Sequence, residues 1–299
     1  MNLNSDNNPL ENLIAVIESD KLAHLSLVQT MQSGQHFRSK VLDDDSIIVV
    51  NQYGLYRMKE DTSGLSIYGE HLFDYEAYFD MNRDYEQIQE ILSRKDPHLE
   101  AAIIMNKGLR ILQQDPFEMI MTFIISQSKQ ISQIKILVER LSHLYGDAAG
   151  AYKEVAYHMF PTPEQLIGVD EVIYKALKMG YRSRYLEDAV KKIVTRTVDL
   201  AAIKSMSYEK AKAELMQIKG VGEKVADCVL LFGYGRFEAF PVDVWIERII
   251  GELYFDKKPS KKELNDFVDD YFGAYKGIAQ QYLFEYARTL ALGKNKPKN

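Results

Sequence analysis

The sequence predicts an α+β protein that is mostly α-helical, with a small antiparallel β-sheet domain at residues 1–80 and a large helical domain at residues 81–299. Three observations support this prediction. Residues 40–68 are rich in Val, Ile and Tyr, which favour strands. From Asp84 onward, apolar residues recur almost throughout at helical spacing. Gly220-Val221-Gly222 separates two apolar helical segments, which predicts a helix-hairpin-helix motif.

The strands of the N-terminal domain are separated by three turn signals. These are Asp43-Asp44-Asp45, Asn51-Gln52-Tyr53-Gly54 and Asp61-Thr62-Ser63-Gly64. Asn, Asp, Ser and Gly favour turns because they accept local hydrogen bonds or tolerate positive φ. The change to helical spacing places the domain boundary near residues 75–83.

Proline and glycine mark the ends of the predicted helices, because proline cannot continue a helix and glycine often terminates one. The breaks fall at Asp96-Pro97, Asp115-Pro116, Pro161-Thr162-Pro163, Gly180, Gly220–Gly222, Gly233–Gly235, Pro241 and Pro259. The tail, about residues 293–299, has a composition typical of disorder.

The predicted hairpin joins residues 208–217 to an apolar helix at residues 225–232. Glycines such as Gly220 and Gly222 allow positive φ and leave backbone N–H groups free to bind an anion. Such a turn is suited to holding a nucleic-acid backbone without reading its sequence.

Three residues near this hairpin have side chains that can carry out chemistry. Lys224 lies in the first turn after the glycines, where a neutral amine could act as a nucleophile. Cys228 is four residues later and shares its helix face. Asp243 follows Pro241-Val242 and precedes an apolar segment, so we expect it at the start of a third helix. A carboxylate there could accept a proton or stabilise positive charge on a sugar.

Each of these residues also fits an ordinary structural role. Asp243 could be only a helix cap, Lys224 only a solvated phosphate contact, and Cys228 only a small core residue. Their order and spacing, taken together, favour a common site.

The residues Gly220–Cys228, followed by Pro241-Val242-Asp243-Val244, resemble the helix-hairpin-helix motif and catalytic aspartate of 8-oxoguanine DNA glycosylases. The resemblance spans nearly the whole chain. It also includes Ser33–Arg38, Tyr78-Phe79-Asp80, Gly108–Pro116, Gly180–Tyr185 and Ala279–Phe284, in the order of the family.

The resemblance implies that Lys224 attacks the sugar C1′ of a damaged nucleotide and forms a Schiff base, with Asp243 assisting. It implies that the base, once flipped out of the duplex, is bound by four residues: Gly34, Cys228, Gln280 and Phe284. Each of these positions also has an alternative without a function in binding. Gly34 could be only a turn glycine. Gln280 could be only a surface amide, and Phe284 only a core aromatic beside it.

The resemblance further implies that Tyr181 inserts into the duplex and that Arg182 contacts the opposite base, although a turn with solvated charges would show the same residues. We also predict DNA contacts from Gly220, Gly222, Ser128, Lys129 and Trp245.

Three departures from the family pattern bear on specificity. Ser128, Lys129 and Gln130 replace the usual asparagine run, Trp245 replaces a histidine, and Ser39 replaces a frequent tryptophan.

Composition limits the class of protein. The chain has 299 residues, 46% of them hydrophobic, but no apolar run long enough to span a membrane. Together with the absence of a signal at the N-terminus, this predicts a cytoplasmic protein. The single cysteine excludes an intrachain disulfide and a four-cysteine iron–sulfur cluster, and the scattered histidines do not suggest zinc. We expect no metal and no cofactor.

The net charge of −6 is unusual for a DNA-binding protein. The segment from Lys175 to Lys224, however, contains twelve Lys and Arg but only six Asp and Glu. The positive charge is therefore concentrated in the part of the sequence that includes the hairpin.

The sequence therefore predicts a monomeric, bifunctional DNA glycosylase and abasic-site lyase that acts on 8-oxoguanine in duplex DNA. One alternative is an alkyl-base glycosylase that activates water, for which Lys224 has no use. The other is a non-catalytic helix-hairpin-helix module, which leaves Asp243, Gln280 and Phe284 unexplained.

Overall fold

Five antiparallel strands form the predicted N-terminal sheet, in the order β1-β5-β4-β3-β2. The computed structural model describes residues 8–290, so the predicted disordered tail lies outside the described residues. The strands are β1 (Leu13–Glu18), β2 (Ser39–Val41), β3 (Ile47–Asn51), β4 (Gly54–Asp61) and β5 (Gly64–Gly69). The three turn signals fall between β2, β3, β4 and β5, as predicted. The edge strand β1 was not predicted; it pairs with β5.

Helices dominate the rest of the described chain, which confirms the α+β, mostly α fold class. They are α1 (Leu27–Gln32), α2 (Tyr75–Tyr78), α3 (Tyr85–Ser93), α4 (Pro97–Met105), α5 (Pro116–Ser126), α6 (Ile131–Tyr145), α7 (Glu171–Ala176), α8 (Ser183–Val194), α9 (Leu200–Ile203), α10 (Tyr208–Leu215), α11 (Glu223–Tyr234), α12 (Val244–Tyr254), α13 (Lys261–Phe272) and α14 (Lys276–Thr289). Short 3₁₀ helices occur at Pro9–Glu11, Ser19–Leu22, Glu164–Leu166, Gly180–Arg182 and Gly273–Tyr275.

The predicted breaks determine where several helices begin and end. Asp96 and Asp115 are N-caps of α4 and α5, each followed by proline in the first turn. The Asp115 carboxylate accepts a hydrogen bond from the Glu118 backbone N–H at 2.8 Å, which satisfies a donor that the helix start leaves unpaired. At the other end of a helix, Gly235 adopts φ +62° directly after α11, a conformation that favours glycine.

One prediction for the helical region was wrong. Residues 148–158 form the hairpin β6 (Ala148–Tyr152) and β7 (Val155–His158) rather than continuing the helical pattern. Lys153 and Glu154 at its turn both have positive φ. Tyr152 is buried against Ile48 and Val50 of the N-terminal sheet. Packing against a distant strand therefore overrides the helical preference of the local alanines.

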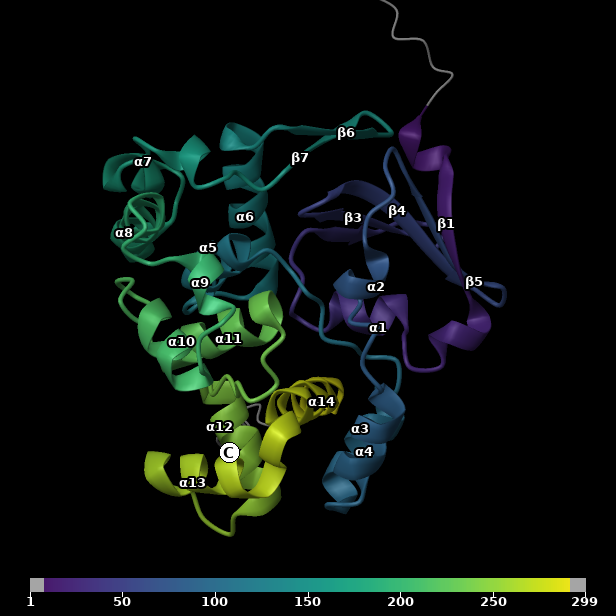
Figure 1. Cartoon of the computed structure of the whole chain (residues 1–299), viewed down its shortest axis with the longest axis vertical. Coiled ribbons are helices and arrows are strands. Elements are labelled where there is room, and N and C mark those ends of the chain that lie inside the picture. Colours follow the sequence, from purple (N-terminus) through teal and green to yellow (C-terminus); the bar gives the residue numbers. More distant parts are fainter. Residues whose placement is uncertain (1–7, 291–299) are drawn as a thin grey trace, which may run out of the picture.

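Two main apolar cores stabilise the molecule. The sheet buries one face against α1 and α2, through residues such as Met31, Ile67 and Tyr78. A larger core joins α3 to α14 and includes α11 packed against α5. Figure 1 shows the sheet at the upper right, with the helices to its left and below it. Helices α3 and α4 contribute to the larger core; the division of the chain into domains near residue 80 stays a prediction.

A buried carboxyl group makes the stability of this core depend on pH. Glu118 of α5 is buried, and this burial raises its pKa to about 7, although Arg38 partly opposes the shift. Because the folded pKa is higher than the unfolded one, this group favours the folded state at low pH. That contribution is lost as the pH rises from about 4.5 through about 7.

We expect Glu118→Gln to increase the free energy of unfolding at pH 8 by about 1–3 kcal/mol, because glutamine removes a buried charge. At pH 4.5 the variant and the wild type should differ much less. Urea denaturation at both pH values measures this difference. An equal increase in the free energy of unfolding at both pH values would contradict the raised pKa of Glu118.

Candidate active site

A cavity of about 140 Å³ lies between α5, α11, α14 and the loop that follows α1. Residues from four separate parts of the sequence line it. Of the predicted site residues, the cavity brings together Gly34, Lys129, Lys224, Cys228, Asp243, Gln280 and Phe284.

The helix-hairpin-helix motif has the predicted geometry and places Lys224 at the cavity. Helix α10 ends at Leu215 and α11 begins at Glu223, with Gly222 as its N-cap. Lys224 is therefore in the first turn of α11. Its Nζ lies 5.1 Å from the centroid of the Phe123 ring on α5. The amine thus lies beside an aromatic wall of the cavity.

The two hairpin glycines have different surroundings. Gly220 has φ +80°, and a Cβ atom there would lie 2.3 Å from the Tyr185 ring. Its carbonyl oxygen accepts a hydrogen bond from Gln127 Nε2 at 2.8 Å. Gly222 has φ −96°, which any residue adopts, and a Cβ atom there would contact nothing within 4 Å. Gly220 is required by packing, whereas Gly222 leaves open space beside the start of α11.

Asp243 caps α12, as predicted. Its carboxylate accepts a hydrogen bond from the Ile246 backbone N–H at 2.8 Å. This bond fixes the side chain at the cavity wall. Asp243 and Lys224 also both line a neighbouring cavity of about 670 Å³ between α11, α12 and α13. The amine and the carboxylate therefore lie on the boundary between the two cavities.

Cys228 lies one helical turn after Lys224 and is 3% exposed. Burial raises the pKa of its thiol to about 11, and the nearby Lys224 only partly offsets this effect. At neutral pH the thiol is therefore uncharged. A neutral sulfur is a polarisable surface against which a flat ring can pack.

Helix α14 presents Gln280 and Phe284 to the cavity. Gln280 is buried, unlike the surface amide that its sequence context alone would suggest, and its Oε1 has no hydrogen-bond partner within residues 8–290. Gly34 has φ +78°, and a Cβ atom there would lie 3.4 Å from Phe284 Cε1. The unpaired amide oxygen and the phenyl ring leave a polar and an apolar surface available to a ligand.

The other predicted residues lie outside this cavity. Ser128 is exposed in the loop between α5 and α6, with φ +53°. Tyr181 is 49% exposed on the 3₁₀ helix before α8. Trp245, in the first turn of α12, packs against the larger core. Gly220 and Gly222 lie in the hairpin on the approach to the cavity.

Arg182 is buried in this structure. Its guanidinium lies 4.4 Å from the centroid of the Tyr181 ring, and Nη2 donates to the Gln127 carbonyl oxygen. Because Gln127 also bonds Gly220, Arg182 connects the turn before α8 to the loop after α5 and to the hairpin. Arg182 is therefore not one of the solvated charges that the alternative interpretation of this turn would require.

Sequence reasoning did not single out several residues that line the cavity. They are Ser33, Phe37, Phe123, Ser126, Ile134, Phe232, Pro241 and Gln281. Phe123, Ile134 and Phe232 belong to apolar helix faces that cannot be distinguished from core by spacing alone. For Gln281, its position next to Gln280 on the same helix was the one available signal.

Within residues 8–290, no group of three or more His, Cys, Asp or Glu side chains could hold a metal ion. No helix in the same range has both the length and the hydropathy needed to cross a membrane.

Comparison with known proteins agrees with this geometry. Residues 17–120 match the family model described as the N-terminal domain of 8-oxoguanine DNA glycosylase. Residues 121–272 match the model of the helix-hairpin-helix (HhH-GPD) superfamily of base excision DNA repair proteins.

Similar proteins occur among curated sequences and solved structures. A probable N-glycosylase/DNA lyase of Methanothermobacter thermautotrophicus is 31% identical over 73% of this chain and 75% of its own length. The N-glycosylase/DNA lyase of Saccharomyces cerevisiae is 33% identical over 60% of this chain and 56% of its own. The structure of Clostridium acetobutylicum 8-oxoguanine glycosylase/lyase, in complex with double-stranded DNA containing cytosine opposite 8-oxoguanine, aligns with a TM-score of 0.87. It is 32% identical and covers 94% of this chain and all of that one.

The fold and the cavity thus define a helix-hairpin-helix protein with an amine and a carboxylate at one site. Within that class, the chain belongs to the 8-oxoguanine DNA glycosylase family.

Proposed function

We propose that this protein is a bifunctional DNA glycosylase and abasic-site lyase that removes 8-oxoguanine from duplex DNA in base excision repair. The observation that carries the proposal is that Lys224 and Asp243 line the same cavity as the Phe284 ring and Gln280, whose Oε1 is unpaired. Membership of the 8-oxoguanine glycosylase family supports the choice of lesion.

Lys224 is the proposed nucleophile. Its nitrogen lone pair forms a bond to C1′ while the bond between C1′ and the base breaks, and the base leaves with the electron pair and takes up a proton. Opening of the sugar ring gives a Schiff base. Loss of a proton from C2′ then expels the 3′ phosphate and nicks the strand. The Phe123 ring lies beside the amine and forms an apolar wall on one side of it.

Asp243 is proposed to stabilise the positive charge that develops on the sugar. Its capping bond to Ile246 fixes the carboxylate in place before the substrate binds. A charge that is already oriented costs no reorganisation during the reaction. The same carboxylate can accept the proton that Lys224 loses when it attacks.

The flipped base is proposed to bind between Phe284 and the neutral Cys228 thiol. Stacking on an aromatic ring stabilises a base by about 1–3 kcal/mol. The Gln280 amide can both donate to and accept from the edge of the base. The Gly34 carbonyl is proposed to accept the N7–H that 8-oxoguanine has and guanine lacks.

Contacts with the rest of the duplex are also proposals. Gly222 leaves space for a phosphate at the start of α11, and the exposed Tyr181 ring can fill the gap in the base stack. Ser128, Lys129 and Trp245 stay predicted DNA contacts, as does Gly220. For Arg182, contact with the opposite base requires the guanidinium to exchange its Gln127 carbonyl partner for the base.

The chain contains one complete set of the proposed active-site residues, which favours action as a monomer. Light scattering coupled to gel filtration tests this point. The cytoplasmic location stays a prediction.

The function is tested by borohydride trapping on a labelled duplex with one 8-oxoguanine opposite each of the four bases in turn. Only a Schiff base is reduced to a permanent protein–DNA link. We expect a covalent adduct with 8-oxoguanine and none with guanine. The relative yields across the four duplexes show how Ser128, Lys129 and Gln130 affect the opposite-base preference.

Other outcomes would lead to different conclusions. An adduct with a bare abasic site but none with 8-oxoguanine would support the lyase activity and would refute 8-oxoguanine as the substrate. Base release from an alkylated duplex without any adduct would favour the alkyl-base glycosylase. No chemistry on any duplex, with DNA binding retained, would favour the non-catalytic module.

A further inference from the structure

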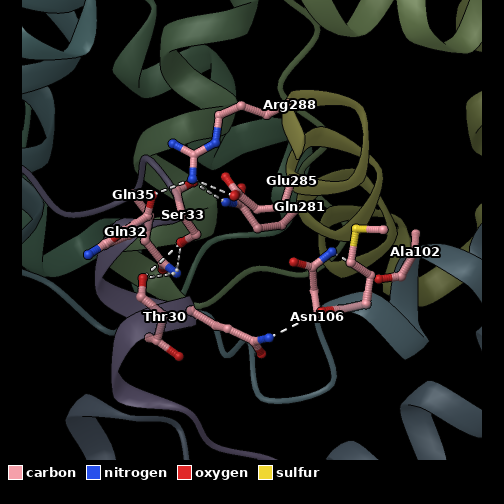
Figure 2. Close-up of polar contacts among 11 residues, drawn as sticks. Thr30, Gln32, Ser33, Gln35, Ala102, Asn106, Gln281, Glu285 and Arg288 are labelled. Atoms are coloured by element: carbon pink, nitrogen blue, oxygen red, sulfur yellow. Dashed lines mark hydrogen bonds and ion pairs between the residues drawn. The ribbon is translucent and has the colours of Figure 1, made fainter. Parts of the chain in front are cut away.

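Besides Gln280 and Phe284, helix α14 carries other polar residues close to the loop that follows α1. Gln281 and Arg288 contact the loop that contains Gly34, and Glu285 forms an ion pair with Arg288 (Figure 2). Gln281 is 3% exposed, and its Nε2 donates to the Ser33 carbonyl oxygen at 2.6 Å. Arg288 Nη2 donates to the Gln32 carbonyl oxygen at 2.7 Å. One helix therefore presents the base-facing side chains and also holds the opposing loop.

Two cavities border the loop at Gly34, whereas the residues on either side of it, Ser33 and Gln35, are fully buried. Gly34 lines the proposed base cavity on one side and a second cavity of about 230 Å³ on the other. Ser39, which stands where the family often has tryptophan, lines this second cavity. At Gly34, which has no side chain and borders a cavity on each side, hydrogen bonds of the neighbouring residues help to set the backbone conformation.

The hydrogen bonds around Gly34 follow a pattern. The carbonyl oxygens of Gln32 and Ser33 accept bonds from α14, and that of Gln35 accepts one from Gln114 Nε2 at 2.9 Å. The Gly34 carbonyl oxygen alone in this segment has no hydrogen-bond partner within the described part of the chain. The carbonyl groups before and after that of Gly34 are thus held by hydrogen bonds, while the Gly34 carbonyl is left free.

The Gln35 side chain fixes the far end of the segment to the core. Its Oε1 accepts from the Leu112 backbone N–H at 2.8 Å, and its Nε2 donates to the Arg110 carbonyl oxygen at 2.7 Å. Gln35 Nε2 also donates to the Ser33 hydroxyl at 2.8 Å. These bonds hold Gln35 and the Ser33 side chain. The bond from Gln281 to the Ser33 carbonyl oxygen restrains the Ser33–Gly34 peptide in addition. Rotation of that peptide changes the φ angle of Gly34, and with it the direction of the Gly34 carbonyl.

We infer that Gln281 is a positioning residue that sets the direction of the Gly34 carbonyl relative to Gln280 and Phe284. The inference rests on the proposed function, because the Gly34 carbonyl is the proposed acceptor for the lesion. Gln281 acts through the loop, and its effect is confined to steps that require recognition of the base.

The test compares two reactions of the same protein. Single-turnover excision of 8-oxoguanine requires the Gly34 carbonyl, whereas nicking at a preformed abasic site does not. We expect Gln281→Met and Gln281→Glu, which are similar in size but lack the amide donor, to slow excision about tenfold, the typical effect of one lost hydrogen bond. Abasic-site nicking should stay within about twofold of the wild type.

Gln89→Met is the matched control. Gln89 is also buried, also donates to a backbone carbonyl, that of Lys107 at 2.8 Å, and also contacts α14 through the Tyr282 hydroxyl. It does not contact the Gly34 loop. Any effect of losing a buried glutamine beside α14 should therefore appear in both variants, but only the Gln281 variants should separate excision from nicking.

A double-mutant cycle with Gly34→Ala distinguishes positioning from direct contact with the base. Alanine is strained at φ +78°, so the loop is already displaced in that variant. If Gln281 acts through the loop, Gln281→Met should have little further effect on excision there. Full additivity would overturn the inference, as would equal losses of excision and nicking. A wild type that fails to excise 8-oxoguanine would instead refute the proposed function.

Discussion

Replacing Lys224 with glutamine should abolish both the borohydride adduct and strand nicking, and should slow base release by more than about 1,000-fold. Glutamine is similar in length and compatible with a helix, so the start of α11 and the packing against Phe123 should remain. Its amide nitrogen has no basic lone pair and cannot form a Schiff base. The loss should therefore be chemical and not structural.

The measurement is trapping and single-turnover kinetics on an 8-oxoguanine duplex, with thermal unfolding to confirm the fold. Lys129→Gln is the control, because Lys129 is another amine that lines the same cavity. At saturating protein it should keep the adduct. If Lys129→Gln lost the adduct and Lys224→Gln kept it, the nucleophile would be Lys129.

Asp243→Asn should slow base release by about 100- to 1,000-fold, the usual effect of removing one electrostatic contact to a transition state. Asparagine caps helices as well as aspartate does, so the bond to the Ile246 N–H and the stability of α12 should be retained. The variant therefore removes the charge and keeps the cap. This separates the two roles that the sequence alone left open.

Asp84→Asn provides the matched control for this change. Asp84 caps α3 in the same way, accepting from the Gln87 N–H at 2.9 Å, but lies outside the cavity. Both variants should unfold at nearly the wild-type temperature, and only Asp243→Asn should lose activity. A normal rate of base release in Asp243→Asn would leave Asp243 with only the capping role.

The helix-hairpin-helix motif could be predicted because its signals are local. Glycines between two apolar helical segments indicate the turn, and a proline followed two residues later by an aspartate before an apolar run indicates the start of α12. These signals depend on backbone conformation and on hydrogen bonds within a few residues. Both are encoded in adjacent positions, and the structure has α11 and α12 at the predicted places.

The hairpin β6–β7 could not be predicted for the opposite reason. Residues 148–151 are three alanines and a glycine, and nothing local favours a strand there. The deciding contact is Tyr152 against Ile48 and Val50, about 100 positions away in the sequence. Side chains that meet only after folding leave no periodic signal in either segment.

The fold class, the hairpin, the capping aspartate and the position of Lys224 in the first turn of a helix follow from short-range periodicity and turn chemistry, so they could be predicted from the sequence. Three features required the folded structure: which of the predicted residues share one cavity, the burial of Gln280 with a free oxygen, and the burial of Arg182. The hydrogen bond from Gln281 of α14 to Ser33 in the Gly34 loop could not be predicted either, since the two residues are 248 positions apart in the sequence. Such contacts arise from long-range packing, which brings together groups whose spacing along the chain carries no information about their distance.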